Sequence, residues 1–500
     1  MTGDDLTLAI DAGTSVIKAV VFDGGGDEKV VVSRPTALSS PHPGWIEQDM
    51  AEVREMAFAC AAEAARRAPG TISRIALTAQ GDGAWMIRGD GQPARPAVLW
   101  NDARAVQIVD RWTDDGRLEE AFRINGSLGN LGLPHAILSW FLENDPDALA
   151  DVRDVVTCGS WLFESLTGRR GLHPSEASAP WLDVRTGQYS EEIIELFDLA
   201  DIKAKLPVVL GARDLTAALS PRAAREMRLQ PGLPVTLAPY DVLSTAVGGG
   251  CVATGSAFCI LGTTLCTGII TEAPDTQGAP TGLTLLGIDG SRATRVFPTL
   301  AGTEVVHWAR GVMGLAAAEE VTALAARSVP GARGVRVLPY LAEAGERMPF
   351  LDPDARGAIL GLKVSTRQED VARGVLEGLA HTIRDCLDAS GAHPRELILS
   401  GGGSASEVWC QVIADVTGVP VVRVQGTQIG AKGAMMYAAV ANGSFSDLEE
   451  AAERVVIRGA SYAPDPGVRE FFDERHTDFL RTRVALAERW VTWRTTDKER

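Results

Sequence analysis

Asp11 stands at the end of an apolar run and is followed by a turn that contains Gly13, Thr14 and Ser15. A carboxylate beside the amides of such a turn can hold a magnesium ion, usually through water, next to phosphate oxygens that backbone N–H groups bind. An aspartate before a glycine is also an ordinary turn residue, so a structural role stays open. Lys18 is a further candidate for a phosphate contact, although a solvated strand residue is the simpler interpretation.

Asp241 follows Pro239, at a point where a strand is expected to end and a short helix to begin. A carboxylate at a helix N-terminus is stabilised as the anion, which suits a general base that must be ionised at neutral pH. The alternative is an ordinary helix N-cap, for which aspartate is equally well suited.

Two polar loops, at residues 79–85 and 99–105, place amide, carboxylate, guanidinium and indole groups within a short stretch of chain. Such groups suit a polyhydroxylated ligand, through paired hydrogen bonds and an apolar face. Each residue alone is as typical of a surface or a cap, and a tryptophan is as typical of a core. The candidate substrate residues are Gln80, Gly81, Asp82, Trp100, Asp102, Arg104 and Asp241.

A glycine triplet, Gly401 to Gly403, separates an apolar run expected to be a strand from an amphipathic segment expected to be a helix. Ser404 and Glu407 would form a capping box at the start of that helix. Glycines let the backbone approach a nucleotide closely, although a tight strand-to-helix connection needs them equally. No Gly-x-x-x-x-Gly-Lys-Ser/Thr pattern is present, which excludes a P-loop protein.

The design of the first turn recurs in the second half of the chain, where residues 258–271 contain two apolar runs around Gly262, Thr263 and Thr264. Gly13 and Gly262 are 249 residues apart, almost half of the chain. This spacing predicts two related domains, 1–248 and 249–500, that meet face to face and each offer a hairpin to one cleft. Two hairpins that share a turn by chance are the alternative.

The elements that would hold these residues alternate between strands and helices, which is typical of an α/β fold. The runs around the first turn and a third run at 29–34 predict a β-meander. Asp49 and Glu52 form a capping box for a helix that ends near Arg67, and a strand is expected at 72–78. From Pro466 the chain reads as one amphipathic helix that packs on the second domain.

Length and charge limit the classes of protein to which the chain can belong. At about 150 residues per domain, 500 residues predict several domains with their own cores. The net charge is −17 and the basic residues are scattered, which argues against a nucleic-acid partner. The apolar runs are too short for a membrane span, and residues 1–6 lack the pattern of a signal peptide, so a cytoplasmic location is expected.

The seven cysteines and seven histidines are dispersed along the chain. Without Cys-x-x-Cys or His-Glu-x-x-His patterns, we expect reduced thiols and no dedicated metal cage. The sequence leaves the oligomeric state open, with a homodimer among the states that it allows.

Several stretches resemble those of the FGGY carbohydrate kinases and occur in the same order, and together they extend over nearly the whole chain. They include DAGTSVIKAVVFD at the start, PGWIEQDM at 43–50, YDVLSTAVGGG from Tyr240, the segment 338–362 with its GERMPFLDPDARG sequence, and SGGGSASEVWCQVIADVTG at 400–418. The resemblance implies two ribonuclease-H-like, actin-type ATPase domains with ATP and sugar in the cleft between them.

The resemblance also implies roles for single residues. Asp241 matches the catalytic base, Asp11 the metal-associated acid, and Gly402 and Gly403 the adenine-side glycines. Thr14, Gly262 and Thr263 match the hairpins that contact phosphate. The candidate residues for ATP are Gly13, Thr14, Ser15, Lys18, Gly262, Thr263, Thr264, Gly401, Gly402 and Gly403, with Mg²⁺ at Asp11.

The loop Gln80, Gly81, Asp82 and Gly83 departs from the Gln-Met-His-Gly of many xylulose kinases and is similar to erythritol kinases. Other stretches are similar to L-xylulose kinases. The sequence therefore predicts transfer of the γ-phosphoryl group of ATP to a terminal hydroxyl of a small ketose or polyol, with xylulose and erythritol favoured over glycerol or a hexose. The alternatives are a non-catalytic sugar or nucleotide sensor, an actin-like or chaperone-like ATPase and, more remotely, a dinucleotide-dependent dehydrogenase.

Overall fold

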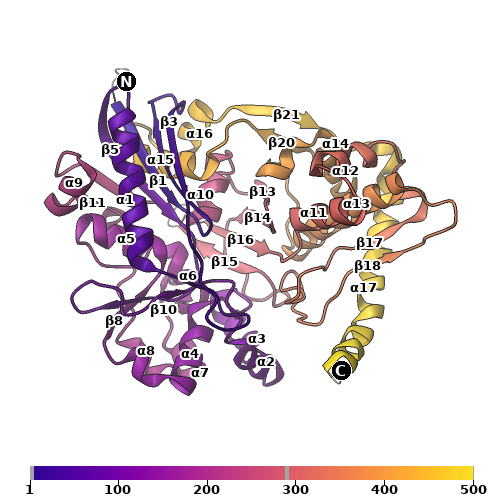
Figure 1. The fold of residues 1–500 in the computed structure, drawn as a ribbon, viewed down its shortest axis with the longest axis horizontal. Helices are drawn as coiled ribbons and strands as arrows, with labels where there is room; N and C mark the ends of the chain where they lie inside the picture. Colours follow the sequence, from indigo (N-terminus) through magenta and orange to yellow (C-terminus); the bar gives the residue numbers. More distant parts are fainter. Residues whose placement is uncertain (1–4, 288–291, 499–500) are drawn as a thin grey trace. The chain divides into compact units, whose positions relative to one another are not determined.

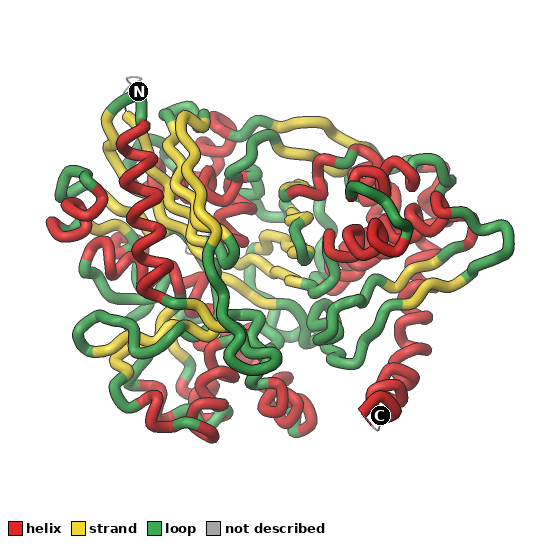
Figure 2. The backbone as a smooth tube through the Cα atoms, viewed as in Figure 1, coloured by secondary structure: helices red, strands yellow, loops and turns green. Residues whose placement is uncertain are grey.

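The computed structural model of the chain describes residues 5–287 and 292–498 (Figures 1 and 2). Two compact units are present. Unit 1 comprises residues 1–252, 271–294 and 426–456, and unit 2 comprises residues 253–270, 295–425 and 457–500. Residues 249–252 and two later segments thus belong to unit 1, so the compact units do not follow one cut through the chain. A boundary between 248 and 249 remains our proposal for where the two sequence halves divide.

Unit 1 is built on a six-stranded sheet with the order β11-β12-β5-β1-β2-β3. The first three strands form the antiparallel meander that the sequence predicts, and β1 also pairs in parallel with β5, which pairs in parallel with β12. The edge strand β11 is antiparallel to β12. The strands are β1 (Asp5–Ala12), β2 (Val16–Phe22), β3 (Glu28–Pro35), β5 (Thr71–Ala79), β11 (Thr216–Ala218) and β12 (Pro234–Leu237).

Unit 2 repeats this pattern in the strands β16-β14-β13-β19-β20-β21 of a seven-stranded sheet that begins with β15 (Leu283–Leu286). Here β13 is antiparallel to β14 and parallel to β19, β19 is parallel to β20, and β21 is antiparallel to β20. The order, and the senses of these four pairings, match those of unit 1, which agrees with the duplication inferred from the two turns. The strands are β13 (Ala257–Leu261), β14 (Leu265–Thr271), β16 (Ala293–Pro298), β19 (Leu397–Ser400), β20 (Val421–Val424) and β21 (Arg458–Tyr462).

Helices α1 (Met50–Arg67) and α15 (Ile429–Ala441) pack on the sheet of unit 1, and α1 runs along its strands (Figure 1). The Asp49 side chain accepts a hydrogen bond from the Glu52 N–H and caps α1, as predicted. Further helices of this unit are α2 (Val106–Asp114), α3 (Arg117–Asn125), α4 (Pro134–Asn144), α5 (Cys158–Thr167), α6 (Pro174–Trp181), α7 (Glu191–Leu196), α8 (Ala200–Lys203), α9 (Pro221–Met227), α10 (Asp241–Gly248) and α16 (Leu448–Val455). Its shorter strands include β4 (Glu47–Gln48), β6 (Trp85–Arg88), β7 (Ala97–Val98), β8 (Val152–Val156), β9 (Leu182–Asp183), β10 (Gln188–Tyr189) and β15 (Leu283–Leu286).

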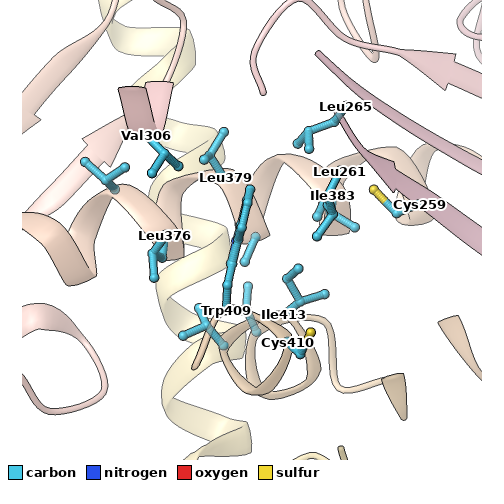
Figure 3. Close-up of a cluster of buried hydrophobic side chains, with 14 of the residues drawn as sticks. Cys259, Leu261, Leu265, Val306, Leu376, Leu379, Ile383, Trp409, Cys410 and Ile413 are labelled. Atoms are coloured by element: carbon cyan, nitrogen blue, oxygen red, sulfur yellow. The ribbon is translucent and has the colours of Figure 1, made fainter. Parts of the chain in front are cut away.

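The core of unit 2 lies between its sheet and two helices, α13 (Gln368–Ala389) and α14 (Glu407–Thr417). The Trp409 ring stands among Leu376, Leu379 and Ile413 in this core (Figure 3). The C-terminal helix α17 (Arg469–Lys498) packs on α14 and on β17 (Arg336–Leu338), as predicted. Further elements are α11 (Thr303–Val312), α12 (Ala318–Ala325) and β18 (Ala358–Leu360).

One predicted helix cap is wrong. Ser404 lies in a short 3₁₀ turn, where its hydroxyl donates to the Gly401 carbonyl, and the side chain of Ser406 caps α14 by accepting from the Trp409 N–H. The 3₁₀ turn delays the start of the α-helix beyond the residue that the Ser404–Glu407 spacing indicated.

All seven cysteines are buried and free of disulfide bonds, in line with their dispersed positions. In the part of the chain that the structure describes, no helix is both long and apolar enough to cross a membrane. The prediction about a leader rests on residues 1–6, of which 1–4 lie outside the described residues.

Candidate active site

The carboxyl ends of three neighbouring parallel strands bring the acidic candidates of unit 1 together. The β1 strand ends beside Asp11, β5 leads into Gln80, Gly81 and Asp82, and the segment after β12 leads to Asp241. Backbone hydrogen bonds link these ends, since the Gln80 N–H donates to the Ala12 carbonyl over 2.9 Å and the Ala238 N–H to the Leu77 carbonyl over 2.8 Å. This edge is where ligands bind in open α/β sheets.

The neighbours of the Asp241 carboxyl change its acidity. Burial, the neighbouring charge of Asp11 and the charge of Asp82 raise its pKa to about 7, against which its bond to the Val242 N–H acts. Asp241 is the first residue of α10, whereas Tyr240 occupies the N-cap position, so the N-cap alternative for Asp241 is wrong. A carboxyl with a pKa near 7 in a polar site is suited to take up a proton near neutral pH.

Glu176, on α6, is a fourth acidic group in this region, and the sequence analysis missed it. It is only 5% exposed, and burial raises its pKa to about 6, with the charge of Asp82 adding to the shift. The Ser160 hydroxyl donates to one of its oxygens. A lone glutamate in an α-helical segment carries no motif, so only its three-dimensional neighbours reveal it.

The first turn is fixed by a ring of side-chain hydrogen bonds. The Thr14 hydroxyl donates to Gln80 Oε1 over 2.7 Å and accepts from Trp100 Nε1 over 3.0 Å. Gln80 Nε2 donates to Gln48 Oε1, and Gln48 Nε2 donates in turn to the Thr14 carbonyl. Gln48 was missed as a site residue, although it lies in the PGWIEQDM stretch. The ring ties the turn to both polar segments.

The loop after β5 has a shape that its sequence dictates. A Cβ atom on Gly81 would lie 2.4 Å from the ring of Tyr240, so glycine is required there as long as the tyrosine keeps this position. Asp82 adopts φ 55°, a left-handed conformation that aspartate tolerates better than most residues. Gly81 therefore leaves room for an aromatic ring beside Asp241, and Asp82 is held in a defined backbone conformation.

Asp102 and Arg104 form a closed ion-pair cluster. Asp102 is fully buried, and its oxygens accept from the Ile46 N–H, the Arg104 N–H and the Arg104 guanidinium at 2.7–2.9 Å. The same guanidinium donates to Glu47 over 2.7 Å and lies over the Trp45 ring. Among the described residues, its Nη1 has no hydrogen-bond partner. The cluster fixes the segment that carries Gln48, which favours a supporting role over direct ligand contact.

Trp85 and Trp100, the two tryptophans of the polar loops, lie in different surroundings. Trp85 is fully buried beside Trp161, with ring centroids 5.9 Å apart, and belongs to the core. Trp100 is partly exposed and donates to Thr14, so it lies at the acidic site.

The residues at Asp11 fit a magnesium ion that brings most of its own ligands. Asp11 is partly exposed, and burial raises its pKa while Lys18 opposes the shift. No cluster of three or more His, Cys, Asp or Glu suited to a metal occurs among the described residues. Mg²⁺ commonly binds through one carboxylate, water and substrate phosphates. A cation near Asp11 would also relieve its repulsion with Asp241.

The second turn, in unit 2, is fixed by backbone hydrogen bonds instead. The N–H groups of Thr303 and Glu304, in the first turn of α11, donate to the carbonyls of Gly262 and Thr263 over 2.9 and 3.2 Å. In a trans peptide the N–H group points away from the preceding carbonyl. The N–H groups of Thr263 and Thr264 therefore face away from α11, and neither has a protein acceptor among the described residues. Such paired amides are suited to a phosphate oxygen.

A pocket of about 480 Å³ lies beside this turn in unit 2. This volume is in the usual range for small-molecule sites. Gly402 and Gly403 line it, whereas Gly401, at φ +84°, packs against the Leu261 backbone. A Cβ atom on Gly402 would meet no protein atom within 4 Å. The lining residues are Leu261, Gly262, Thr263, Thr303, Val306, His307, Ala318, Glu319, Thr322, Gly402, Gly403, Ala405, Ser406 and Trp409.

The pocket residues from α11 and α12, among them His307 and Glu319, were not predicted. They lie on helices far from the glycine triplet in sequence, and only the fold brings them to it.

Family models match both halves of the chain. The model of the N-terminal domain of the FGGY family of carbohydrate kinases matches residues 6–248, and that of its C-terminal domain matches residues 257–442.

Individual relatives are similar over nearly their whole length. An erythritol kinase of Brucella abortus (strain 2308) is 31% identical, with 97% of each chain covered. A glycerol kinase of Aromatoleum aromaticum (strain DSM 19018 / LMG 30748 / EbN1) is 30% identical, with 89% of this chain and 92% of the relative covered. The crystal structure of a xylulose kinase from Rhodospirillum rubrum superposes with a TM-score of 0.87 at 25% identity, and covers 97% of this chain and 99% of its own.

Proposed function

The chain belongs to the FGGY family of carbohydrate kinases, and from that premise we propose that it phosphorylates a terminal hydroxyl of an open-chain polyol or ketose of four or five carbons. The observation that carries the proposal is the Asp241 carboxyl, whose pKa burial, Asp11 and Asp82 raise to about 7 at the end of the parallel strands. A proton acceptor of that strength beside hydroxyl-binding groups suits an alcohol as the acceptor substrate.

In the proposed reaction Asp241 takes the proton of the substrate hydroxyl. The hydroxyl oxygen forms a bond to the γ-phosphorus of ATP, while the bond from that phosphorus to the β–γ bridging oxygen breaks and ADP leaves. Phosphoryl transfer depends mainly on positioning and on neutralised charge, so the task of the protein is to align the two reactants. The hydrogen-bonded ring of Thr14, Gln80 and Gln48 would hold the loop that binds the acceptor substrate in a fixed position.

Asp11 would hold Mg²⁺ through water in the acidic site of unit 1. When bound with ATP, the ion neutralises charge on the phosphate oxygens. The Thr14 carbonyl accepts from Gln48, and the Ser15 carbonyl accepts from the Thr36 N–H. In a trans peptide the N–H group points away from the preceding carbonyl, so the N–H groups of Ser15 and Val16 face away from these partners. These two N–H groups suit the same phosphates.

The unit 2 pocket is the proposed site for ATP. Gly402 opens space for the nucleotide because a Cβ atom there would meet no protein atom within 4 Å. The turn amides of Thr263 and Thr264 would bind phosphate oxygens, where anions gain most from backbone N–H groups. We propose that Gly262 and Gly403 allow the ligand to approach the backbone closely.

The substrate class rests on the loop after β5. Relatives named for erythritol, glycerol and xylulose are similar to the chain to comparable extents, so their names do not separate the candidates. Asp82 and Glu176 offer acceptor oxygens, and Tyr240 fills the space over Gly81. Several acceptor groups near one another suit a substrate with several hydroxyls, which favours erythritol or a pentulose over a shorter triol.

A coupled ADP-release assay over erythritol, D- and L-xylulose, the pentitols, glycerol and hexoses tests the proposal. We expect turnover with a tetritol or pentulose and a fall in kcat/KM of about 10²-fold for that substrate in Asp82→Ala, since hydrogen bonds to charged groups also position the substrate. A preference for glycerol or a hexose would contradict the substrate class. ATP binding without sugar-dependent turnover would instead support a sensor.

A further inference from the structure

The segment 338–362 matches the kinase family, yet the proposed reaction assigns it no role. Within it, Glu346 is 1% exposed and lies outside the acidic site of unit 1. Its Oε1 atom accepts from the Leu300 N–H over 2.6 Å and from the Arg347 N–H over 2.9 Å, and its Oε2 atom accepts from the Ala301 N–H over 3.2 Å. A buried carboxylate that accepts two backbone bonds from one loop, at Leu300 and Ala301, is a strong anchor for that loop.

The anchored loop supports the second glycine–threonine turn. The Leu265 N–H donates to the Ala301 carbonyl over 3.0 Å, and the Thr299 N–H donates to the Leu265 carbonyl over 2.9 Å. Next along the chain, Thr303 and Glu304 donate to the turn carbonyls. The loop at 299–304 therefore bonds to the turn both at the start of β14 and at its tip.

Close backbone contact strengthens this coupling. A Cβ atom on Gly302 would lie 2.2 Å from the Thr263 carbonyl oxygen and 2.4 Å from Thr264 Cα. The loop and the turn thus touch without intervening side chains, so a shift of the loop must displace the turn. Arg347 adds a second attachment, because its Nε donates to the Pro298 carbonyl over 2.7 Å.

We propose that Glu346 is a positioning residue for ATP: it holds the loop 299–304, and through it orients the outward-facing amides of Thr263 and Thr264. This inference rests on the proposed role of the turn as a phosphate site. Glu346 would bind neither ATP nor sugar, and it would act through the turn alone.

Glu346→Gln is the variant that tests this role. Glutamine keeps the size and one oxygen, but its NH₂ group cannot accept from the Ala301 N–H. Glu377→Gln in α13 is the matched control, because Glu377 is 4% exposed and accepts from the Gly331 N–H and from Arg373 without any bond to the turn. Glu346→Asp, which keeps the charge, is a milder variant should the glutamine variant fold poorly.

Two measurements separate the role of Glu346 from the function of the turn. By hydrogen–deuterium exchange without ligand, Glu346→Gln should speed exchange of the hydrogen-bonded amides of Leu265, Thr303 and Glu304 by about tenfold, whereas Glu377→Gln should not. In the kinase assay, the KM for ATP should rise about tenfold in Glu346→Gln, with the sugar KM within twofold of the wild type. Glu346→Asp should show smaller changes in the same direction.

Unchanged exchange of the Leu265, Thr303 and Glu304 amides in Glu346→Gln, or equal changes in Glu377→Gln, would overturn the inference. So would faster exchange with an unaltered KM for ATP. Loosening of the turn in a protein whose wild-type form binds no nucleotide would overturn the proposed function, while it would support the coupling between Glu346 and the turn.

Discussion

The two glycine–threonine turns share a sequence pattern and a place in matching sheets, but they are held by different means. In unit 1, the side chains of Gln48, Gln80 and Trp100 bond to Thr14. In unit 2, the first turn of α11 bonds to the carbonyls of Gly262 and Thr263. The side-chain network brings further polar groups to the first turn, whereas the backbone support leaves the second turn with its own amides as hydrogen-bonding groups. The duplicated scaffold can therefore serve an acid–base site in one unit and an anion site in the other.

The loops after β5 and β19 extend this contrast, because these two strands hold the same position in their sheets. The first loop carries Asp82 in a left-handed conformation, and the second carries Gly402 at the wall of a pocket. Changes in the first loop should affect the acceptor substrate, and changes in the second should affect ATP.

The largest effect is expected from Asp241→Asn, which should lower kcat by at least about 10²-fold because the general base is lost. The KM for ATP should change little, since the ATP site is proposed in unit 2. In the wild type, kcat/KM should fall about tenfold per pH unit below pH 7, because protonation of Asp241 with its pKa of about 7 removes the base.

Steady-state kinetics from pH 5.5 to 9 in both proteins measure these effects. Sugar-dependent turnover retained in Asp241→Asn would remove this residue from the role of base. A rise in the KM for ATP as large as the fall in kcat would contradict the assignment of the acid–base site to unit 1 and of the ATP site to unit 2.

The reverse pattern is expected from Gly402→Val. The valine side chain should enter the pocket and raise the KM for ATP by about tenfold, with a smaller change for the sugar, because added atoms exclude ligand from that space. The fold should tolerate the change, since a Cβ atom there meets no protein atom within 4 Å.

Gly401→Val is the matched control for Gly402→Val, because Gly401 has φ +84° and a Cβ atom would lie 2.7 Å from the Leu261 carbonyl. It should destabilise unit 2 outright. Unchanged kinetic constants in a well-folded Gly402→Val protein would mean that the glycine triplet only connects strand and helix and does not contribute to ATP binding.

Much of the fold and part of the site could be predicted from local sequence. The meander and the helix after Asp49 follow from apolar periodicity and a cap, and Asp11 and Asp241 stand out because each follows an apolar run. Glu176 could not be found in this way, because its importance comes from burial near Asp82. The return of residues 271–294 and 426–456 to unit 1 also depends on long-range packing that no local pattern encodes.

Asp102 and Arg104 show the converse, since local sequence suggests a ligand contact where the contacts observed also fit a supporting role. Polar side chains in a loop suggest a ligand, but here most of their hydrogen-bonding groups bond to one another, to Glu47 and to the backbone. Ser404 and Ser406 differ by two positions, and the 3₁₀ turn alone decides which one caps α14.

A smaller effect is expected on the stability of unit 1, through the buried carboxyl of Glu176 in the acidic site. The pKa of Glu176 is raised from 4.5 to about 6, so the folded protein holds its proton more tightly than the unfolded chain does. This proton contributes stability that is fully present below pH 4.5 and is lost as the pH rises through 6. Relative to the wild type, Glu176→Gln should therefore gain about 2 kcal/mol between pH 4 and pH 7. Thermal unfolding of both proteins without ligand across that range measures the gain, and a difference independent of pH would contradict it.

The comparison that includes the smallest expected effect, at Thr263, separates the two turns themselves. Thr14→Val removes a hydroxyl that bonds to both Gln80 and Trp100, and the unpaired groups should cost about 1–3 kcal/mol, a few degrees in Tm. Thr263→Val alters an exposed side chain in a turn held by its backbone, so its stability should change by less than about 0.5 kcal/mol. Thr14→Ser, which keeps the hydroxyl, should recover most of the loss. Thermal unfolding of the ligand-free variants gives the comparison directly: equal losses at the two threonines would mean that both turns depend on their side chains, and the distinction between a side-chain network in unit 1 and a backbone support in unit 2 would then fail.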